Sequence, residues 1–161
     1  MKDEDLIGQY IKERYQLQDI IGTGGMGVVF KAYDHQTRQD CAVKLLKMSV
    51  HKATTHQRFD EEIRLITKLS SPHIVQVYDT GLTAHHRRFV VMELLHGFPL
   101  SKVLKSETIL DAERALYIAL GICTALQVAH HAGVIHRDLK PANIFVDPTP
   151  DGDVIKILDF G

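Results

Sequence analysis

One short run of the chain carries the functional groups that phosphoryl transfer to a hydroxyl requires. It reads His136-Arg137-Asp138-Leu139-Lys140-Pro141-Ala142-Asn143. This reaction needs a carboxylate near the attacking oxygen, a cation beside the moving phosphoryl group and oxygen ligands for Mg²⁺. Asp138, Lys140 and Asn143 provide these groups, and Asn143 is the only asparagine in the chain. The run therefore predicts a catalytic loop.

A second carboxylate, Asp159, follows a short apolar segment near the end of the sequence. Within Asp159-Phe160-Gly161, this carboxylate could bridge Mg²⁺ to the β- and γ-phosphates of a nucleotide. The tripeptide alone would equally fit a turn after a strand. Its position downstream of residues 136–143 favours a metal site formed by Asn143 and Asp159.

A glycine-rich segment, Gly22-Thr23-Gly24-Gly25-Met26-Gly27-Val28-Val29, contains the spacing G-x-G-x-x-G. The same spacing occurs in dinucleotide-binding folds, where the last glycine opens a helix. Here Gly27 leads into an apolar, β-branched run, so we expect a strand, a turn and a second strand. Such a flap could cover a triphosphate with its backbone N–H groups. An ordinary hairpin turn is the alternative, and a dinucleotide-dependent oxidoreductase is disfavoured.

Lys44 lies in an apolar segment, where it would either point to solvent or serve a nucleotide. In the second interpretation its ammonium contacts the α- and β-phosphates and is held by a carboxylate from the following helix. Glu61 and Glu62 are the candidates. Glu62 shares the apolar face of that helix, whereas Glu61 lies on the polar side. We therefore predict a Lys44–Glu62 pair, because a charge on an inward face requires a partner.

The elements that must position these residues differ between the two halves of the chain. The first half is rich in β-branched and aromatic residues, which predict strands at 15–21, 28–33, 41–46, 74–78 and 88–94. A helix is expected over 55–69. The second half begins with a long helix over about 111–132 that ends at Gly133, and its widely spread apolar residues predict packing on more than one side. Two short strands, 144–146 and 154–158, follow and are joined by a hairpin loop over 147–153.

Composition limits the classes of function. The 161 residues are 45% hydrophobic and 24% charged, with 19 basic and 20 acidic residues, which is typical of a globular protein. This balance gives no electrostatic basis for binding nucleic acid or an anionic membrane. No signal-peptide pattern and no run of 18 apolar residues is present, so no membrane segment is expected.

Two cysteines, Cys41 and Cys123, are far apart and form no C-x-x-C pair. They predict a reducing, cytoplasmic location with both thiols as small core residues. The histidine pairs at 85–86 and 130–131 lack the accompanying cysteine or carboxylate spacing of a closed metal site. A histidine-based metal cluster is therefore disfavoured.

Taken in order, these motifs resemble those of protein serine/threonine kinases, in particular the bacterial group that is similar to eukaryotic kinases. The resemblance covers about residues 15–161; Lys140 favours the serine/threonine class, and residues 24–27 with 141–144 favour the bacterial branch. It implies an α+β, protein-kinase-like fold. An N-lobe of antiparallel sheet with one main helix (15–92) would follow an extension (1–14), and a hinge (93–97) would lead to the first, incomplete part of a helical C-lobe (98–161).

The resemblance also implies a role for individual residues. ATP and Mg²⁺ would bind, and Mn²⁺ could replace Mg²⁺. Met92 would be the gatekeeper, the backbone of Glu93 and Leu95 would bond the adenine edge, and the ring would lie between Val29, Ala42 and Phe145. The expected nucleotide contacts are Ile21, Gly22, Gly24, Gly25, Gly27, Val29, Ala42, Lys44, Glu93, Leu95 and Phe145. The expected catalytic residues are Asp138, Lys140, Lys44 and Glu62, and the expected metal ligands are Asn143 and Asp159.

Further expectations from the resemblance concern the architecture around the site and the partners. Ile66, His136 and Phe160 would form a hydrophobic stack in which His136 is architectural. Arg137 would pair with a phosphate on an activation segment that follows Gly161, and the substrate would be a protein serine or threonine. Without a partner or the rest of the C-lobe, the long helix would expose apolar residues. At most weak activity is expected of the chain alone, and the alternative is an ATP-binding or interaction module that is inactive alone.

Overall fold

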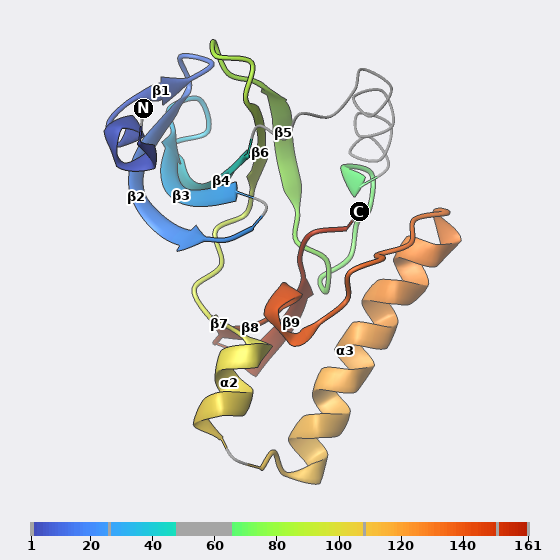
Figure 1. Cartoon of the computed structure of the whole chain (residues 1–161). Helices are drawn as coiled ribbons and strands as arrows, with labels where there is room; N and C mark the ends of the chain where they lie inside the picture. The colour runs from blue at the N-terminus through green and yellow to red at the C-terminus, as the bar shows by residue number, and fades with distance from the viewer. Residues whose placement is uncertain (1, 26, 48–65, 108, 151, 161) are drawn as a thin grey trace. The chain divides into compact units, whose positions relative to one another are not determined.

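The computed structural model describes residues 2–25, 27–47, 66–107, 109–150 and 152–160, which fall into two compact units (Figure 1). The first unit contains the described residues up to 47 together with 77–94. The second contains residues 66–76 and the described residues from 95 onward. Most of the helix predicted at 55–69, including Glu61 and Glu62, lies outside the described residues.

The first unit is a six-stranded antiparallel sheet in the order β1-β2-β3-β4-β6-β5. A 3-10 helix, η1 (Asp3–Leu6), precedes it. The strands are β1 (Tyr10–Ile11), β2 (Tyr15–Thr23), β3 (Gly27–Asp34), β4 (Gln39–Leu46), β5 (Val77–Leu82) and β6 (Arg88–Met92). The strands predicted at 15–21, 28–33, 41–46 and 88–94 are confirmed as β2, β3, β4 and β6.

The strand predicted at 74–78 is placed too early, because β5 begins only at Val77. Ile74 instead forms an isolated parallel bridge with Ile157, and the Val75 N–H donates to the Ile157 carbonyl at 3.0 Å. Ile74 and Val75, which suggested an earlier start of the strand, thus bond to Ile157 and belong to the second unit.

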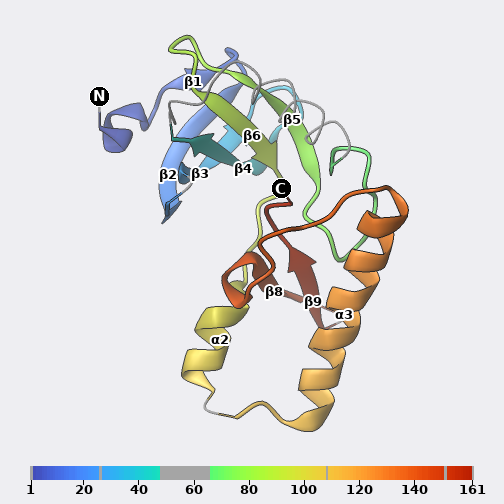
Figure 2. The ribbon, with the colours of Figure 1, turned by 45° about the vertical axis from the view of Figure 1, so that its right-hand side comes forward.

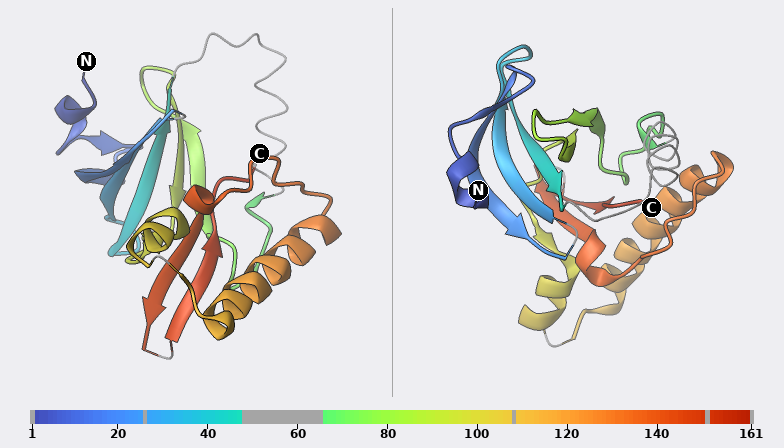
Figure 3. Two further views of the ribbon diagram at one scale, coloured as in Figure 1. Left: turned by 60° about the horizontal axis from the view of Figure 1, so that its bottom comes forward. Right: turned by 45° about the horizontal axis from the view of Figure 1, so that its top comes forward.

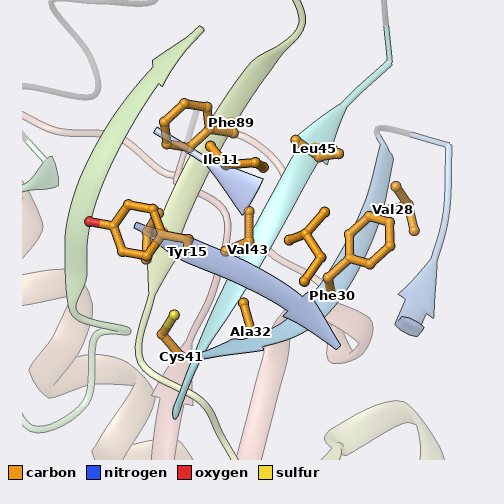
Figure 4. Packing of buried hydrophobic residues seen from close by; sticks show 11 residues of the cluster. Ile11, Tyr15, Val28, Phe30, Ala32, Cys41, Val43, Leu45 and Phe89 are labelled. Atoms are coloured by element: carbon orange, nitrogen blue, oxygen red, sulfur yellow. The ribbon is translucent and has the colours of Figure 1, made fainter. Parts of the chain in front are cut away.

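Alternate side chains of the strands form the core of the first unit. Successive side chains of a strand point to opposite faces of the sheet, and one set meets in a buried cluster (Figure 4). The labelled members of this cluster are Ile11, Tyr15, Val28, Phe30, Ala32, Cys41, Val43, Leu45 and Phe89. The intervening residues of β3 and β4, among them Val29, Ala42 and Lys44, therefore lie on the other face.

Residues ahead of β2 are attached to this sheet. β1 pairs with β2, and Ile11 is buried in the core cluster. The sequence sets residues 1–14 apart as an extension, and this boundary stays a prediction. η1 and β1 were not predicted, because each is too short to show a periodic pattern.

Asp34 holds the start of β2 to the turn after β3. Its carboxylate accepts hydrogen bonds from Arg14 Nε (2.8 Å) and Nη2 (2.6 Å), and from the Gln36 N–H and the Thr37 hydroxyl. The residue is only 5% exposed. Hydrogen bonding from Arg14 holds the pKa of Asp34 well below its ordinary value, despite an opposing effect of burial.

In the second unit, β7 (Phe98–Pro99), β8 (Ile144–Thr149) and β9 (Gly152–Ile157) form an antiparallel sheet in that order. α2 (Leu100–Ser106) and α3 (Ala112–His131) precede β8, and η2 (Pro141–Asn143) leads directly into it. Figure 3 shows this hairpin of β8 and β9 beside the two helices. α2 and β7 were not predicted.

The hairpin of β8 and β9 is longer than predicted. Both strands are confirmed, but the loop expected over 147–153 is largely paired, since Pro148 lies opposite Asp153 and Thr149 opposite Gly152. β7 pairs only with Phe145 and Val146 of β8. Among the described residues, Pro148 therefore has a neighbouring strand, β9, on one side only. Proline is tolerated at such an edge position.

The long helix α3 confirms the prediction over 111–132. Asp111 caps its start by accepting from the Arg114 N–H at 2.8 Å. At its end, Gly133 has φ +75°, its N–H donates to His130, and the Val134 N–H donates to Ala129. This pair of bonds is a Schellman motif, which confirms Gly133 as the residue after the cap.

One face of α3 packs on β9 (Figure 2). Gly121 makes the approach close, because a Cβ there would lie 2.8 Å from the Ile155 Cβ. The opposite face is exposed, with Leu116 61% and Leu120 58% accessible. The predicted packing on more than one side is therefore not found among the described residues, whereas the expected exposure of apolar residues is. Cys123 is exposed as well, so its assignment to the core is wrong, whereas Cys41 is buried. By length and composition, α3 is the one described helix that could cross a membrane.

We expect Asp34→Asn to lower the free energy of unfolding by about 2 kcal/mol, because the buried hydrogen bonds of a charged acceptor are weakened. The lowered pKa of folded Asp34 means that this stabilisation is present at neutral pH and is lost as the pH falls. The difference between the two proteins should therefore shrink below about pH 4. Urea denaturation at several pH values measures it.

Asp40→Asn is the matched control, because within the described part of the chain it breaks the exposed pair with Lys31. Its effect should stay below about 1 kcal/mol at every pH. An Asp34→Asn effect that does not depend on pH would contradict the assignment of the stabilisation to the ionised carboxylate.

Candidate active site

Two polar side chains of the loop between α3 and β8 converge on Asp138. Lys140 Nζ donates to Asp138 Oδ2 at 2.6 Å. Asn143 Nδ2 donates to the Asp138 carbonyl oxygen at 2.9 Å and to Oδ2 at 3.3 Å. The Asn143 N–H also bonds the Lys140 carbonyl, which begins the turn of η2. The residues that the sequence groups as a catalytic loop are thus brought together.

The electrostatic environment keeps Asp138 ionised. The hydrogen bond from Lys140 is the largest cause of a lowered pKa for this carboxyl, and the hydrogen bond from Asn143 acts in the same direction. The side chains of Asp138 and Lys140 are 40% and 49% exposed, so a solvent-borne group can reach both. Asp138 is therefore available as a proton or hydrogen-bond acceptor at neutral pH.

The backbone brings the two predicted metal ligands to one end of the β8–β9 hairpin. Asn143 immediately precedes β8, and Asp159 follows β9 after a single residue. Ile144 lies opposite Ile157, and the Leu158 N–H donates to the Asn143 carbonyl at 2.9 Å. Because the two strands run in opposite directions, the start of β8 lies beside the end of β9.

The chemistry of these two residues suits Mg²⁺. Asn143 is buried and uses Nδ2 for Asp138, so the amide oxygen is the atom suited to a cation. Asp159 supplies a carboxylate, and Mg²⁺ prefers one or two such ligands with phosphate and water completing its octahedron. The described residues contain no group of three histidine, cysteine or acidic residues that could hold a metal.

His136 connects the two segments of the candidate site. Its Nε2 bonds the Leu158 carbonyl at 2.7 Å and its Nδ1 accepts from the Asp138 N–H at 3.3 Å. A carbonyl only accepts, so Nε2 carries the proton. The ring is 2% exposed and contacts Phe160 at a centroid distance of 4.8 Å. This environment favours an architectural residue over a proton-transfer group.

Two residues of these segments have a positive φ angle, which is unfavourable for any residue other than glycine. Arg137 has φ +63° and Asp159 has φ +54°. A residue with a Cβ in this left-handed region is held there at a cost of about 1 kcal/mol. Both positions border the hydrogen bonds of His136 and Leu158, which hold the chain in this form.

In the first unit, the predicted nucleotide residues share one face of the sheet. Val29 lies opposite Lys44, Lys44 opposite Val90, and Ala42 opposite Met92. Their neighbours along the strands form the core cluster on the other face. Lys44 is only 9% exposed, and its predicted partner Glu62 lies outside the described residues, so their pairing stays a prediction.

The glycine-rich segment forms the turn between β2 and β3. Gly22 pairs with Val29, and the Gly24 N–H donates to the Gly27 carbonyl at 2.9 Å. Gly27 opens β3 rather than a helix, which removes the dinucleotide-binding interpretation. Ile21 lies at a register shift of β2 and is 52% exposed.

The glycines of this turn differ in what the fold demands of them. A Cβ at Gly27 would collide with the carbonyl oxygen of Leu45 in β4. A Cβ at Gly24 or Gly25 would meet no atom of the described residues within 4 Å. The fold therefore requires only Gly27, and the openness above the other two is consistent with a ligand that approaches the backbone.

The remaining predicted contacts lie around the segment after β6. Glu93 belongs to the first unit, whereas Leu95 and Phe145 belong to the second. Phe145 lies on β8 between Ile144 and Val146, which are buried in the core of the second unit, so its ring lies on the opposite face. Asp147, which binds the backbone at residues 96 and 97, was not predicted. The only signal in the sequence for this role is that Asp147 directly follows the apolar residues 144–146.

Comparison with known proteins agrees with this geometry. The family described as protein kinase domain matches residues 15–161. The chain is 39% identical to the serine/threonine-protein kinase PknA of Mycobacterium tuberculosis over 160 residues, which are 96% of this chain and 36% of PknA. It is 36% identical to PknB of Mycobacterium leprae over 156 residues, which are 94% of this chain and 25% of PknB. The chain thus spans about a quarter to a third of these relatives.

A solved structure gives the fold. The crystal structure of the PknI kinase domain of Mycobacterium tuberculosis aligns with a TM-score of 0.84, over 95% of this chain and 61% of that chain. At 24% identity, this likeness concerns the fold. The predicted kinase-like α+β fold is confirmed.

We expect Lys140→Met to raise the pKa of Asp138 toward its ordinary value, because the largest cause of the lowered pKa is removed. Carboxyl-carbon NMR titration of Asp138 measures the change. Lys105→Met, on the exposed side of α2, is the control and should leave Asp138 unchanged. An unchanged titration in Lys140→Met would contradict the observed ion pair.

We expect Gly27→Ala to lower the free energy of unfolding by roughly 1–3 kcal/mol, because the new methyl group overlaps the β4 backbone. Gly24→Ala should change it by less than about 0.5 kcal/mol, because the added Cβ meets no atom. Thermal denaturation compares the two variants. Equal destabilisation would show that the turn differs from the one described.

Proposed function

The chain belongs to the protein kinase domain family, and on this premise we propose that it transfers the γ-phosphate of ATP to a serine or threonine hydroxyl of a protein. The observation that carries the proposal is the convergence of Lys140 and Asn143 on the ionised Asp138 carboxylate. The relatives PknA and PknB bear the name serine/threonine-protein kinase, which supports this reaction class.

In the proposed reaction, Asp138 binds the substrate hydroxyl and receives its proton as the oxygen attacks the γ-phosphorus and ADP leaves. Lys140 lies beside this carboxylate and supplies positive charge next to the transferred group. His136 and Asn143 hold the Asp138 backbone by hydrogen bonds to its N–H and its carbonyl oxygen. These contacts orient the acceptor before the substrate arrives.

The proposal also assigns the nucleotide contacts residue by residue. Lys44, positioned by Glu62, would contact the α- and β-phosphates, and Gly22 to Gly27 would cover them. Val29, Ala42 and Phe145 would contact the adenine ring, and the backbone of Glu93 and Leu95 its edge. The shared sheet face of Val29, Ala42 and Lys44 supports this assignment.

Asn143 and Asp159 are the proposed ligands of Mg²⁺, which Mn²⁺ could replace. The hydrogen bond from Leu158 to Asn143 supports their joint use. The ion would supply positive charge to the β- and γ-phosphates when bound. A cytoplasmic location is also proposed, and the two free cysteines, Cys41 and Cys123, support it.

The decisive measurement uses the 161-residue chain itself. Calorimetry should detect Mg-ATP binding, and [γ-³²P]ATP should label serine or threonine of a generic basic protein. We expect Asp138→Asn to reduce transfer at least about 100-fold, because the proton acceptor is lost. Mg-ATP affinity should be retained, because the proposed role of Asp138 lies with the hydroxyl.

Asp40→Asn is the control, because it makes the same chemical change on the exposed surface of the first unit. Unchanged transfer in Asp138→Asn would refute the assigned role. Mg-ATP binding without transfer by the unmodified chain would instead favour a nucleotide-binding module that is inactive alone.

A further inference from the structure

The backbone that follows Leu95 is bound by a single carboxylate from β8. The N–H groups of His96 and Gly97 both donate to Asp147 Oδ1, at 2.7 Å and 2.8 Å. Hydrogen bonds to an ionised acceptor are roughly twice as strong as neutral ones. A side chain about fifty residues away in the sequence therefore restrains two consecutive peptide units.

Two further features hold this segment against β8. A Cβ at Gly97 would collide with the carbonyl of Val146, so only glycine allows this approach. Immediately afterwards, Phe98 pairs with Val146 and Pro99 with Phe145 in the β7–β8 ladder. The chain from 96 to 99 is thus fixed to β8 by side-chain and backbone contacts in succession, and Figure 1 shows β7 beside β8.

Asp147 also has a defined relation to Phe145. The two residues are separated by one position on β8, so their side chains lie on the same face of the strand. Ile144 and Val146 lie on the other face, in the buried core of the second unit. The carboxylate that holds residues 96–97 and the ring proposed to contact adenine therefore belong to one rigid strand.

We propose that Asp147 is a positioning residue for adenine, which sets the backbone of Leu95 relative to the ring of Phe145. This inference rests on the proposed function, in which Leu95 bonds the adenine edge and Phe145 contacts its face. Asp147 acts through the N–H groups of His96 and Gly97 and does not itself touch the nucleotide. All the residues involved belong to the second unit.

A selective effect on adenine separates positioning from a general structural role. Calorimetry should compare Mg-ATP, adenosine and Mg-tripolyphosphate as probes of the whole ligand, the base and the phosphates. We expect Asp147→Ala to weaken ATP and adenosine about tenfold. Tripolyphosphate affinity should be unchanged, because its proposed contacts are with Lys44, Asn143 and Asp159.

Asp147→Asn keeps the shape and an acceptor oxygen, so it should fold normally and weaken adenosine only about threefold. Asp153→Asn is the matched control on the same hairpin, because its carboxylate contacts Arg114 instead. Amide NMR provides a binding-independent readout: the His96 and Gly97 protons should move upfield in Asp147→Ala and remain in place in Asp153→Asn.

The outcomes distinguish the inference from the proposed function. If the unmodified chain binds neither ATP nor adenosine, the proposed function fails and the inference fails with it. If it binds both and Asp147→Ala binds adenosine equally well, only the inference fails. Equal weakening of adenosine and tripolyphosphate would also overturn it, because that result indicates a general loss of structure.

Discussion

The pairing of β8 with β9 is the constraint on which the candidate site depends. It places Asn143 and Asp159 at one end of a hairpin, although they are separated by sixteen positions in the sequence. The bond between Leu158 and Asn143 extends the ladder past the last paired residues. One face of the β8–β9 hairpin buries Ile155 against α3. The strand pairing that aligns the polar residues therefore also forms the core of the second unit.

Both units use the two faces of a strand for separate purposes. In β4, Val43 and Leu45 enter the core while Ala42 and Lys44 lie on the opposite face. In β8, Ile144 and Val146 are buried while Phe145 and Asp147 are not part of that core. Burial of one face thus holds the residues of the other in fixed positions, which reduces the conformational entropy lost when a ligand binds.

Patterns within short segments of the sequence were sufficient to predict much of this structure. The apolar spacing of α3, its Gly133 end and the order of residues 136–143 are properties of short segments, and the structure confirms them. β7 and the role of Asp147 depend on partners about fifty residues away, and no local pattern encodes them. The early start predicted for β5 has the same origin, because Ile74 pairs with distant Ile157.

The hydrogen bonds around Asp138 divide its carboxylate into two unlike oxygens. Lys140 and Asn143 both donate to Oδ2. Oδ1 is therefore the oxygen on which an incoming hydroxyl can be received without displacing either donor. The proposed acceptor is therefore asymmetric: in the proposed reaction a substrate hydroxyl would be received at Oδ1, and this difference between the two oxygens exists before any substrate binds.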